Sequence, residues 1–87
     1  MMPSARKQAI RMGAARGREL ARMHLASGHH VGELNRIRKR LKDDRTAEII
    51  FDGVYLRRVE RWAPVMVRAF QRAALGMLAC AAKGKVP

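Results

Sequence analysis

Cysteine, aromatic residues and acidic residues are all scarce in this 87-residue sequence. A single cysteine, Cys80, cannot form an intramolecular disulfide, so a reducing compartment is expected. The charged N-terminus is followed by no apolar stretch, which excludes a secretory signal peptide. The sequence therefore predicts a cytoplasmic protein.

Aromatic residues are too few to build a large core. The chain holds two Phe, one Trp and one Tyr, and much of its 48% apolar share is Ala and Met. That share is still typical of a globular protein, and a chain of this length has room for one core. We expect a single small basic domain, 1–87, with frayed termini at 1–3 and 83–87.

No long apolar run is free of polar residues. The most apolar stretch, Val65 to Ala82, contains Arg68, Gln71 and Arg72, which makes it a poor membrane-spanning helix. We therefore expect no membrane partner.

Acidic residues are heavily outnumbered by basic ones. The 19 Lys and Arg against seven Asp and Glu give a net charge of +12, and most of the cations are Arg. Such self-repulsion is typical of chains that have an anionic partner. The planar guanidinium of Arg can grip a phosphate group through two parallel hydrogen bonds.

Residue types that serve catalysis or metal binding form no recognisable pattern. The acidic residues are scattered, and no Gly-rich phosphate-binding loop is present. The candidate soft metal ligands have spacings that fit no zinc site. These ligands are His24, His29, His30 and Cys80. We expect no enzyme activity, no catalytic residue, no metal and no cofactor.

Two amphipathic helices are predicted in the first half of the chain. The first lies between Ser4, a suitable N-cap, and a stop at Gly28, and the second runs from His30 to Lys42. Within the first, three roles remain open for Gly13 and Gly17: approach of another helix, approach of a phosphate backbone, or a bend. The expected buried sides are Ala5, Ala9, Met12, Leu20 and Met23 in the first helix, and Val31, Leu34, Ile37 and Leu41 in the second.

The segment Thr46 to Val59 is compatible with two structures. A helix would place Gly53 in its interior and turn Ile49 to solvent. A β-hairpin would use Asp52-Gly53 as a two-residue turn and pair apolar residues with apolar ones, so the hairpin is favoured.

A last helix is predicted from Pro64 to Ala82, with Trp62 closing the core just before it. Its expected buried side consists of Met66, Phe70, Ala73, Ala74, Met77 and Ala81.

The predicted fold class is mainly α, as a small α+β protein with the order helix–helix–β-hairpin–helix. In element order alone this layout resembles a helix-turn-helix with a wing, whose second helix would enter the major groove. Asn35 and Arg36 are residue types that hydrogen-bond base edges. Arg57 and Arg58 would lie on the return strand of the wing.

We therefore predict a nucleic-acid-binding protein, with DNA favoured over RNA, that neutralises the phosphate backbone with its helix faces. The cations of the second helix are expected to extend the surface formed by the first. The predicted binding residues are Lys7, Arg11, Arg18, Arg22, Asn35, Arg36, Lys39 and Arg40, followed by a second tier of Arg57, Arg58, Arg68 and Arg72.

The alternative is a small interaction protein of the kind that phages and mobile elements produce. Such a protein would bind an acidic protein surface, and inhibit or remodel a host nucleic-acid machine such as a CRISPR effector or a polymerase. The Ala- and Met-rich last helix is also a candidate homodimer surface, because a thin core gains stability from an added partner face.

Overall fold

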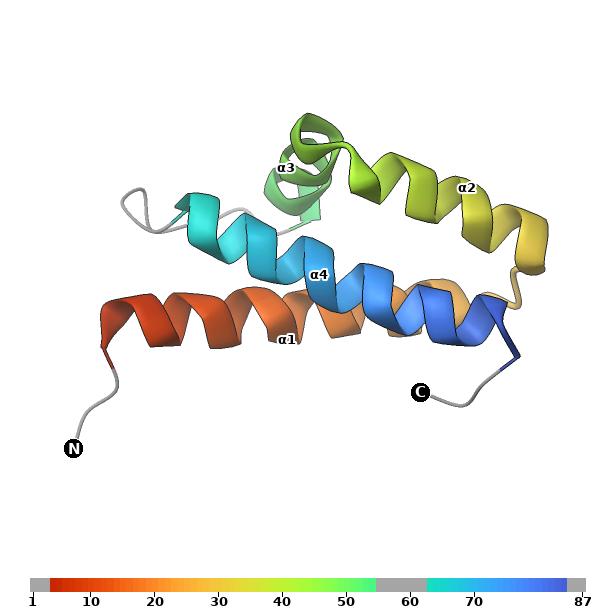
Figure 1. Cartoon of the computed structure of the whole chain (residues 1–87), viewed down its shortest axis with the longest axis horizontal. Helices are drawn as coiled ribbons and strands as arrows, with labels where there is room; N and C mark the ends of the chain where they lie inside the picture. The colour runs from red at the N-terminus through yellow and green to blue at the C-terminus, as the bar shows by residue number, and fades with distance from the viewer. Residues whose placement is uncertain (1–3, 55–62, 85–87) are drawn as a thin grey trace.

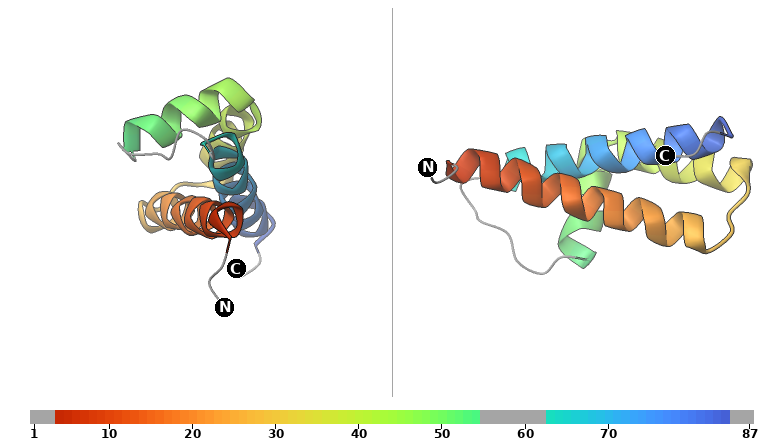
Figure 2. Two further views of the ribbon diagram at one scale, coloured as in Figure 1. Left: turned by 90° about the vertical axis from the view of Figure 1, so that its left-hand side faces the viewer. Right: turned by 90° about the horizontal axis from the view of Figure 1, so that it is seen from below.

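The computed structural model describes residues 4–54 and 63–84 of the chain. The helices in this part of the chain are α1 (Ala5–Ala26), α2 (Val31–Lys42), α3 (Asp44–Val54) and α4 (Ala63–Ala82) (Figure 1). They hold 89% of the described residues, among which no strand occurs. Helices α1 and α4 run side by side in the same direction, and α2 returns on the other side of α4 (Figures 1 and 2). Because α4 contacts α1, α2 and α3, it is the centre of the fold.

The ends of α1 are those that the sequence predicted. The backbone N–H of Lys7 donates to Ser4 Oγ at 3.2 Å, so Ser4 is the N-cap. The helix stops at Gly28, which has a φ of 73° in the left-handed region that favours glycine.

The contact between α1 and α4 depends on two glycines in α1. A Cβ atom placed on Gly13 would lie 2.1 Å from the backbone oxygen of Met66, and one on Gly17 would lie 2.2 Å from that of Phe70. Gly13 and Gly17 are four residues apart, as are their contacts Met66 and Phe70, because the two helices run in parallel. Of the three roles left open for these glycines, the structure shows the approach of another helix.

The buried side of α1 differs from the predicted one. Ala9 and Leu20 are buried as expected, but Met12 and Met23 are 49% and 54% exposed. The helical pattern of the sequence assigned the large apolar side chains of Met12 and Met23 to the buried side. Where two helices pack closely, however, residues with small side chains face the partner helix. The buried residues of α1 are Ala9, Gly13, Gly17, Leu20 and Ala21.

A single cluster of buried apolar residues joins the four helices of the described part. At its centre the rings of Phe51 and Phe70 meet edge to face, with centroids 5.1 Å apart and planes at 69°. The largest fully buried side chains are Phe51, Phe70, Leu41, Met66 and Leu78.

The predicted β-hairpin is wrong, because residues up to Val54 form helix α3. Asp43 ends α2 and starts α3: its Oδ2 accepts from the backbone N–H of Thr46 at 2.9 Å and from Thr46 Oγ1 at 2.6 Å. The helix then buries Phe51 against α4 while Ile49 is 60% exposed. Asp-Gly therefore lies in the last turn of a helix, and within residues 4–54 and 63–84 the predicted α+β class is replaced by helices alone.

The predicted resemblance to a winged helix-turn-helix is also wrong, because no strand that could form a wing occurs in residues 4–54 or 63–84. Arg57, Arg58 and Trp62 lie outside the described residues, as do 1–3 and 85–87 of the predicted frayed ends 1–3 and 83–87. Lys83 and Gly84 are described, and their backbone N–H groups donate to the Ala79 and Ala81 oxygens at the end of α4.

Helix α4 begins with Pro64 in its first turn, as predicted. By length and composition Pro64–Ala82 is apolar enough to cross a membrane, a test that the core helix of a soluble protein also passes. Gln71, expected to be a polar interruption, is buried: its Nε2 donates to the Leu41 backbone oxygen at 2.6 Å and to Asp44 Oδ1 at 3.1 Å. This side chain ties α4 to the junction of α2 and α3, where a helix end leaves carbonyl groups without partners.

Candidate anion-binding surface

Four cations lie along one side of α1 and are named here the α1 strip: Lys7, Arg11, Arg18 and Arg22. Fifteen residues separate its ends, so the strip is about 22 Å long at 1.5 Å per residue. All four are exposed, and none makes a salt bridge within the described residues. The one Arg in these ranges that pairs with a carboxylate is Arg16, 2.9 Å from Glu19 on another side of the helix.

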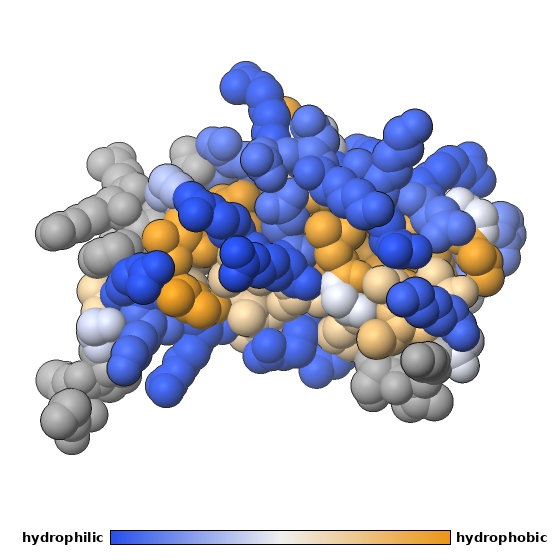
Figure 3. Space-filling model, in the orientation of Figure 1, coloured by the Kyte–Doolittle hydropathy of each residue, from blue (hydrophilic) through white to orange (hydrophobic). Residues whose placement is uncertain are grey.

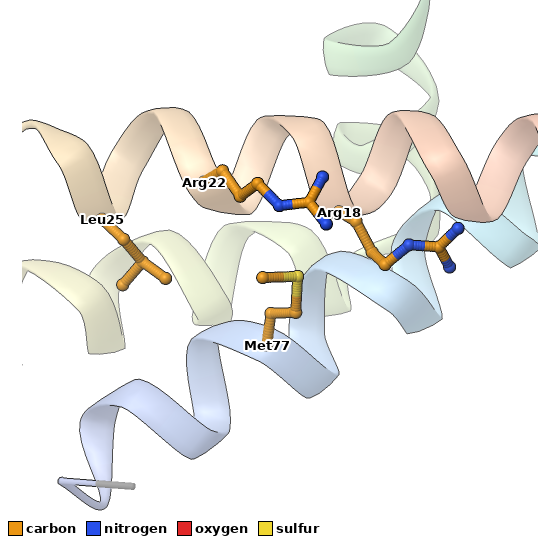
Figure 4. Close-up of a pocket in the computed structure, with 4 residues that line it drawn as sticks. All are labelled: Arg18, Arg22, Leu25 and Met77. Carbon is orange, nitrogen blue, oxygen red and sulfur yellow. The ribbon is translucent and has the colours of Figure 1, made fainter. Parts of the chain in front are cut away.

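The strip borders a groove between α1 and α4. The groove has a volume of about 460 Å³ and is lined by Arg18, Arg22, Leu25 and Met77 (Figure 4). Met77 reaches from α4 toward α1, while the Arg22 side chain extends along α1 toward Arg18. Two guanidinium groups therefore lie beside an apolar floor. The sequence did not predict this groove, because Leu25 and Met77 come together only when α1 packs on α4.

The cations of α2 lie elsewhere on the molecule. Arg36 and Lys39, here called the α2 face, are exposed on the side of the helix opposite the buried Leu34 and Leu41. The α1 strip likewise lies about 140° to 200° around its helix from Leu20, which faces α2. Each helix turns its apolar side to the shared core, so its cations point outward in its own direction. By this geometry the α2 face does not continue the α1 strip.

Arg40 and Asn35 contact groups within the protein. Arg40 lines a small hollow of about 50 Å³ between α1, α2 and α3, beside His24. Asn35 Oδ1 accepts from Arg38 Nη1 at 3.0 Å, while the Nε of half-buried Arg38 has no hydrogen-bond partner in the described part. The predicted base-reading residue Asn35 is thus engaged within its own helix.

A cluster of histidines surrounds the turn between α1 and α2. His30 is the N-cap of α2, its Nδ1 accepting from the N–H groups of Gly32 and Glu33 at 3.1 and 3.4 Å. The Glu33 carboxylate contacts His29 Nδ1 and lies 3.0 Å from His30 Nε2. The hydrogen bond with His29, followed by nearby positive charge, lowers the pKa of Glu33. The sequence predicted that this helix starts at His30, but not that the imidazole is its cap.

His24 contacts this cluster from α1, with its ring centroid 5.5 Å from that of His29. Burial lowers the pKa of His24, and the neighbouring His29 and Arg40 lower it further. Within residues 4–54 and 63–84, no group of three His, Cys, Asp or Glu is placed to hold a metal ion.

The remaining predicted residues form no further site with these. Arg68 and Arg72 are exposed on α4, as is the free Cys80. Arg57 and Arg58 lie outside the described residues.

The fold and its surface define a class: a small helical protein with an exposed cationic strip. The chain matches no protein-family model, no curated protein and no solved structure. Its function is therefore argued from its own residues.

Proposed function

We propose that the protein binds nucleic acid, DNA in the first instance, in the cytoplasm, and does so through phosphate contacts of the α1 strip. One observation carries the proposal: four exposed cations share one side of a helix, without carboxylate partners in the described residues. Three of the four are Arg, which suits phosphate geometry.

Phosphate contacts give affinity and register but no sequence information, so the proposed binding is nonspecific. Direct base reading by α2 receives no support from its surroundings. Asn35 is hydrogen-bonded to Arg38, and α2 is followed by the helix α3 rather than by a wing.

The salt dependence of binding tests this proposal. We expect log affinity for a short duplex DNA to fall linearly with log salt, with a slope of about −3.6 for four neutralised phosphates. The double variant Arg18→Gln/Arg22→Gln should reduce that slope by about 1.8. Arg16→Gln is the matched control on the same helix, because Arg16 already pairs with Glu19. A flat salt response, or an equal effect of the control, would rule the proposal out.

The groove supports a second candidate, an acidic protein surface. A phosphate backbone is polar and gains nothing from contact with the apolar floor of the groove. An acidic amphipathic segment would place its apolar side chains in the groove, and its carboxylates would pair with Arg18 and Arg22. Met77→Gln keeps the charge and approximate size of the residue, so it should weaken such a partner and leave DNA binding unchanged. Co-purification with and without nuclease separates the candidates, because only the protein partner survives the treatment.

A further inference from the structure

The α1 strip and the α2 face point away from each other. In Figure 1, whose vertical direction is the intermediate dimension of the molecule, α2 lies above α4 and α1 lies below it. The Cα atoms span 28 Å in that dimension. Figure 3 shows hydrophilic side chains along the upper and the lower edge, and further ones across the middle of this face between patches of hydrophobic surface. The α1 strip and the α2 face therefore lie on opposite sides of α4, which carries exposed cations of its own, Arg68 and Arg72.

The two sides act independently on an anion in solution. Exposed charges are screened beyond about 8 Å at physiological ionic strength, which is well below the 28 Å span of the molecule. A DNA segment bound to the α1 strip therefore leaves the potential of the α2 face largely unchanged. The α2 face stays free to attract a second anion.

One duplex cannot serve both sides. The persistence length of duplex DNA is about 50 nm, so a duplex does not bend around a body whose Cα atoms extend 40 × 28 × 17 Å without a large elastic cost. Two separate segments satisfy both sides without bending.

We propose that a single copy of this protein bridges two duplex DNA segments, one on the α1 strip and one on the α2 face. This inference rests on the proposed function, since it requires that the strip bind DNA. The α2 face carries fewer cations than the α1 strip, so it is the weaker of the two sites. The consequence is a protein that joins or compacts DNA rather than one that reads its sequence.

A two-colour capture experiment tests the bridge with the full chain. A duplex is fixed to beads, protein is added, and recovery of a second, fluorescent duplex is measured, while fluorescence anisotropy reports binding to one duplex. Arg36→Gln/Lys39→Gln should lower recovery of the second duplex at least about tenfold, and lower binding to one duplex by no more than about twofold. Arg18→Gln/Arg22→Gln should weaken both. Arg68→Gln/Arg72→Gln removes the same charge from α4, and should retain most of the bridging.

The outcomes separate the inference from the function on which it rests. Absence of DNA binding by the wild-type chain refutes the proposed function, and the bridge with it. Binding without recovery of the second duplex refutes the bridge alone. Undiminished bridging by Arg36→Gln/Lys39→Gln would show that two copies join the duplexes, and an equal loss in all three double variants would show bulk charge neutralisation. Either result overturns the single-copy bridge. Circular dichroism of each variant confirms that it is folded.

Discussion

Replacing Gly13 by alanine tests the packing on which the whole fold depends. The Cβ atom would lie 2.1 Å from the Met66 backbone oxygen, where ordinary contacts begin at 3.4 Å. The obstacle is backbone rather than a flexible side chain, so α1 and α4 must separate by about 1 Å at this point. A gap of this size forfeits about a quarter to a half of the attraction between the atoms along the contact.

The free energies can be weighed against each other. Alanine gains about 1 kcal/mol over glycine in a helix interior, while overpacking costs about 1–3 kcal/mol and sometimes more. Because the overlap with Met66 is severe and involves the backbone, we expect the cost of overpacking to exceed the gain in helix propensity. The free energy of unfolding should fall by about 2 kcal/mol. For a chain of this size that lowers the melting temperature by roughly 10 °C.

Gly76→Ala is the matched control, since it makes the same chemical change in α4. A Cβ atom at Gly76 meets nothing within 4 Å, so only the helix propensity changes and the stability should rise by up to about 1 kcal/mol. Thermal and urea unfolding followed by circular dichroism measure both variants. If Gly13→Ala were as stabilising as Gly76→Ala, the backbones of α1 and α4 would not be in contact and the reasoning would fail.

Three further substitutions test the junctions between helices. Gln71→Leu leaves the buried Leu41 carbonyl without its donor, so urea unfolding should show a loss of about 1–3 kcal/mol; an unchanged midpoint would show that water replaces the amide. Asp43→Ala removes the acceptor for Thr46 at the start of α3 and should lower the melting temperature by a few degrees, an effect that Asp43→Asn should largely avoid. Because the pKa of His24 is lowered in the folded state, the unfolded chain takes up that proton first, and stability is lost as the pH falls from about 6.5 toward the folded pKa. His24→Gln should remove this part of the pH dependence, and an identical pH profile for the variant would contradict the assignment.

The two proposed DNA contacts differ in how far the sequence predicts them. The α1 strip follows from helical periodicity, which places residues 7, 11, 18 and 22 on one side of any helix that contains them. Its separation from the α2 face does not follow, because periodicity gives the direction of a side chain relative to its own helix only. The relative direction of two helices depends on packing around α4.

Helix α3 shows where local pattern fails. Asp52-Gly53 is a strong hairpin signal. In the folded chain, however, Phe51 packs on Phe70 of α4, a contact that stabilises the helix, and the hydrogen bond between Asp43 and Thr46 caps the start of that helix. The pairing that favoured a hairpin used residues close in sequence. The contact that decided against it joins residues in different helices.

By itself the sequence determined the positive charge, the limits of α1, α2 and α4, and the outward direction of the cations on each helix, because composition, caps and periodicity are local properties. Only the tertiary structure decided the helical state of α3, the close contact at Gly13 and Gly17, the groove at Met77 and the separation of the two cationic sides. Each of these depends on which residue of a distant helix lies opposite, and the free energy of that contact is absent until the chain is folded.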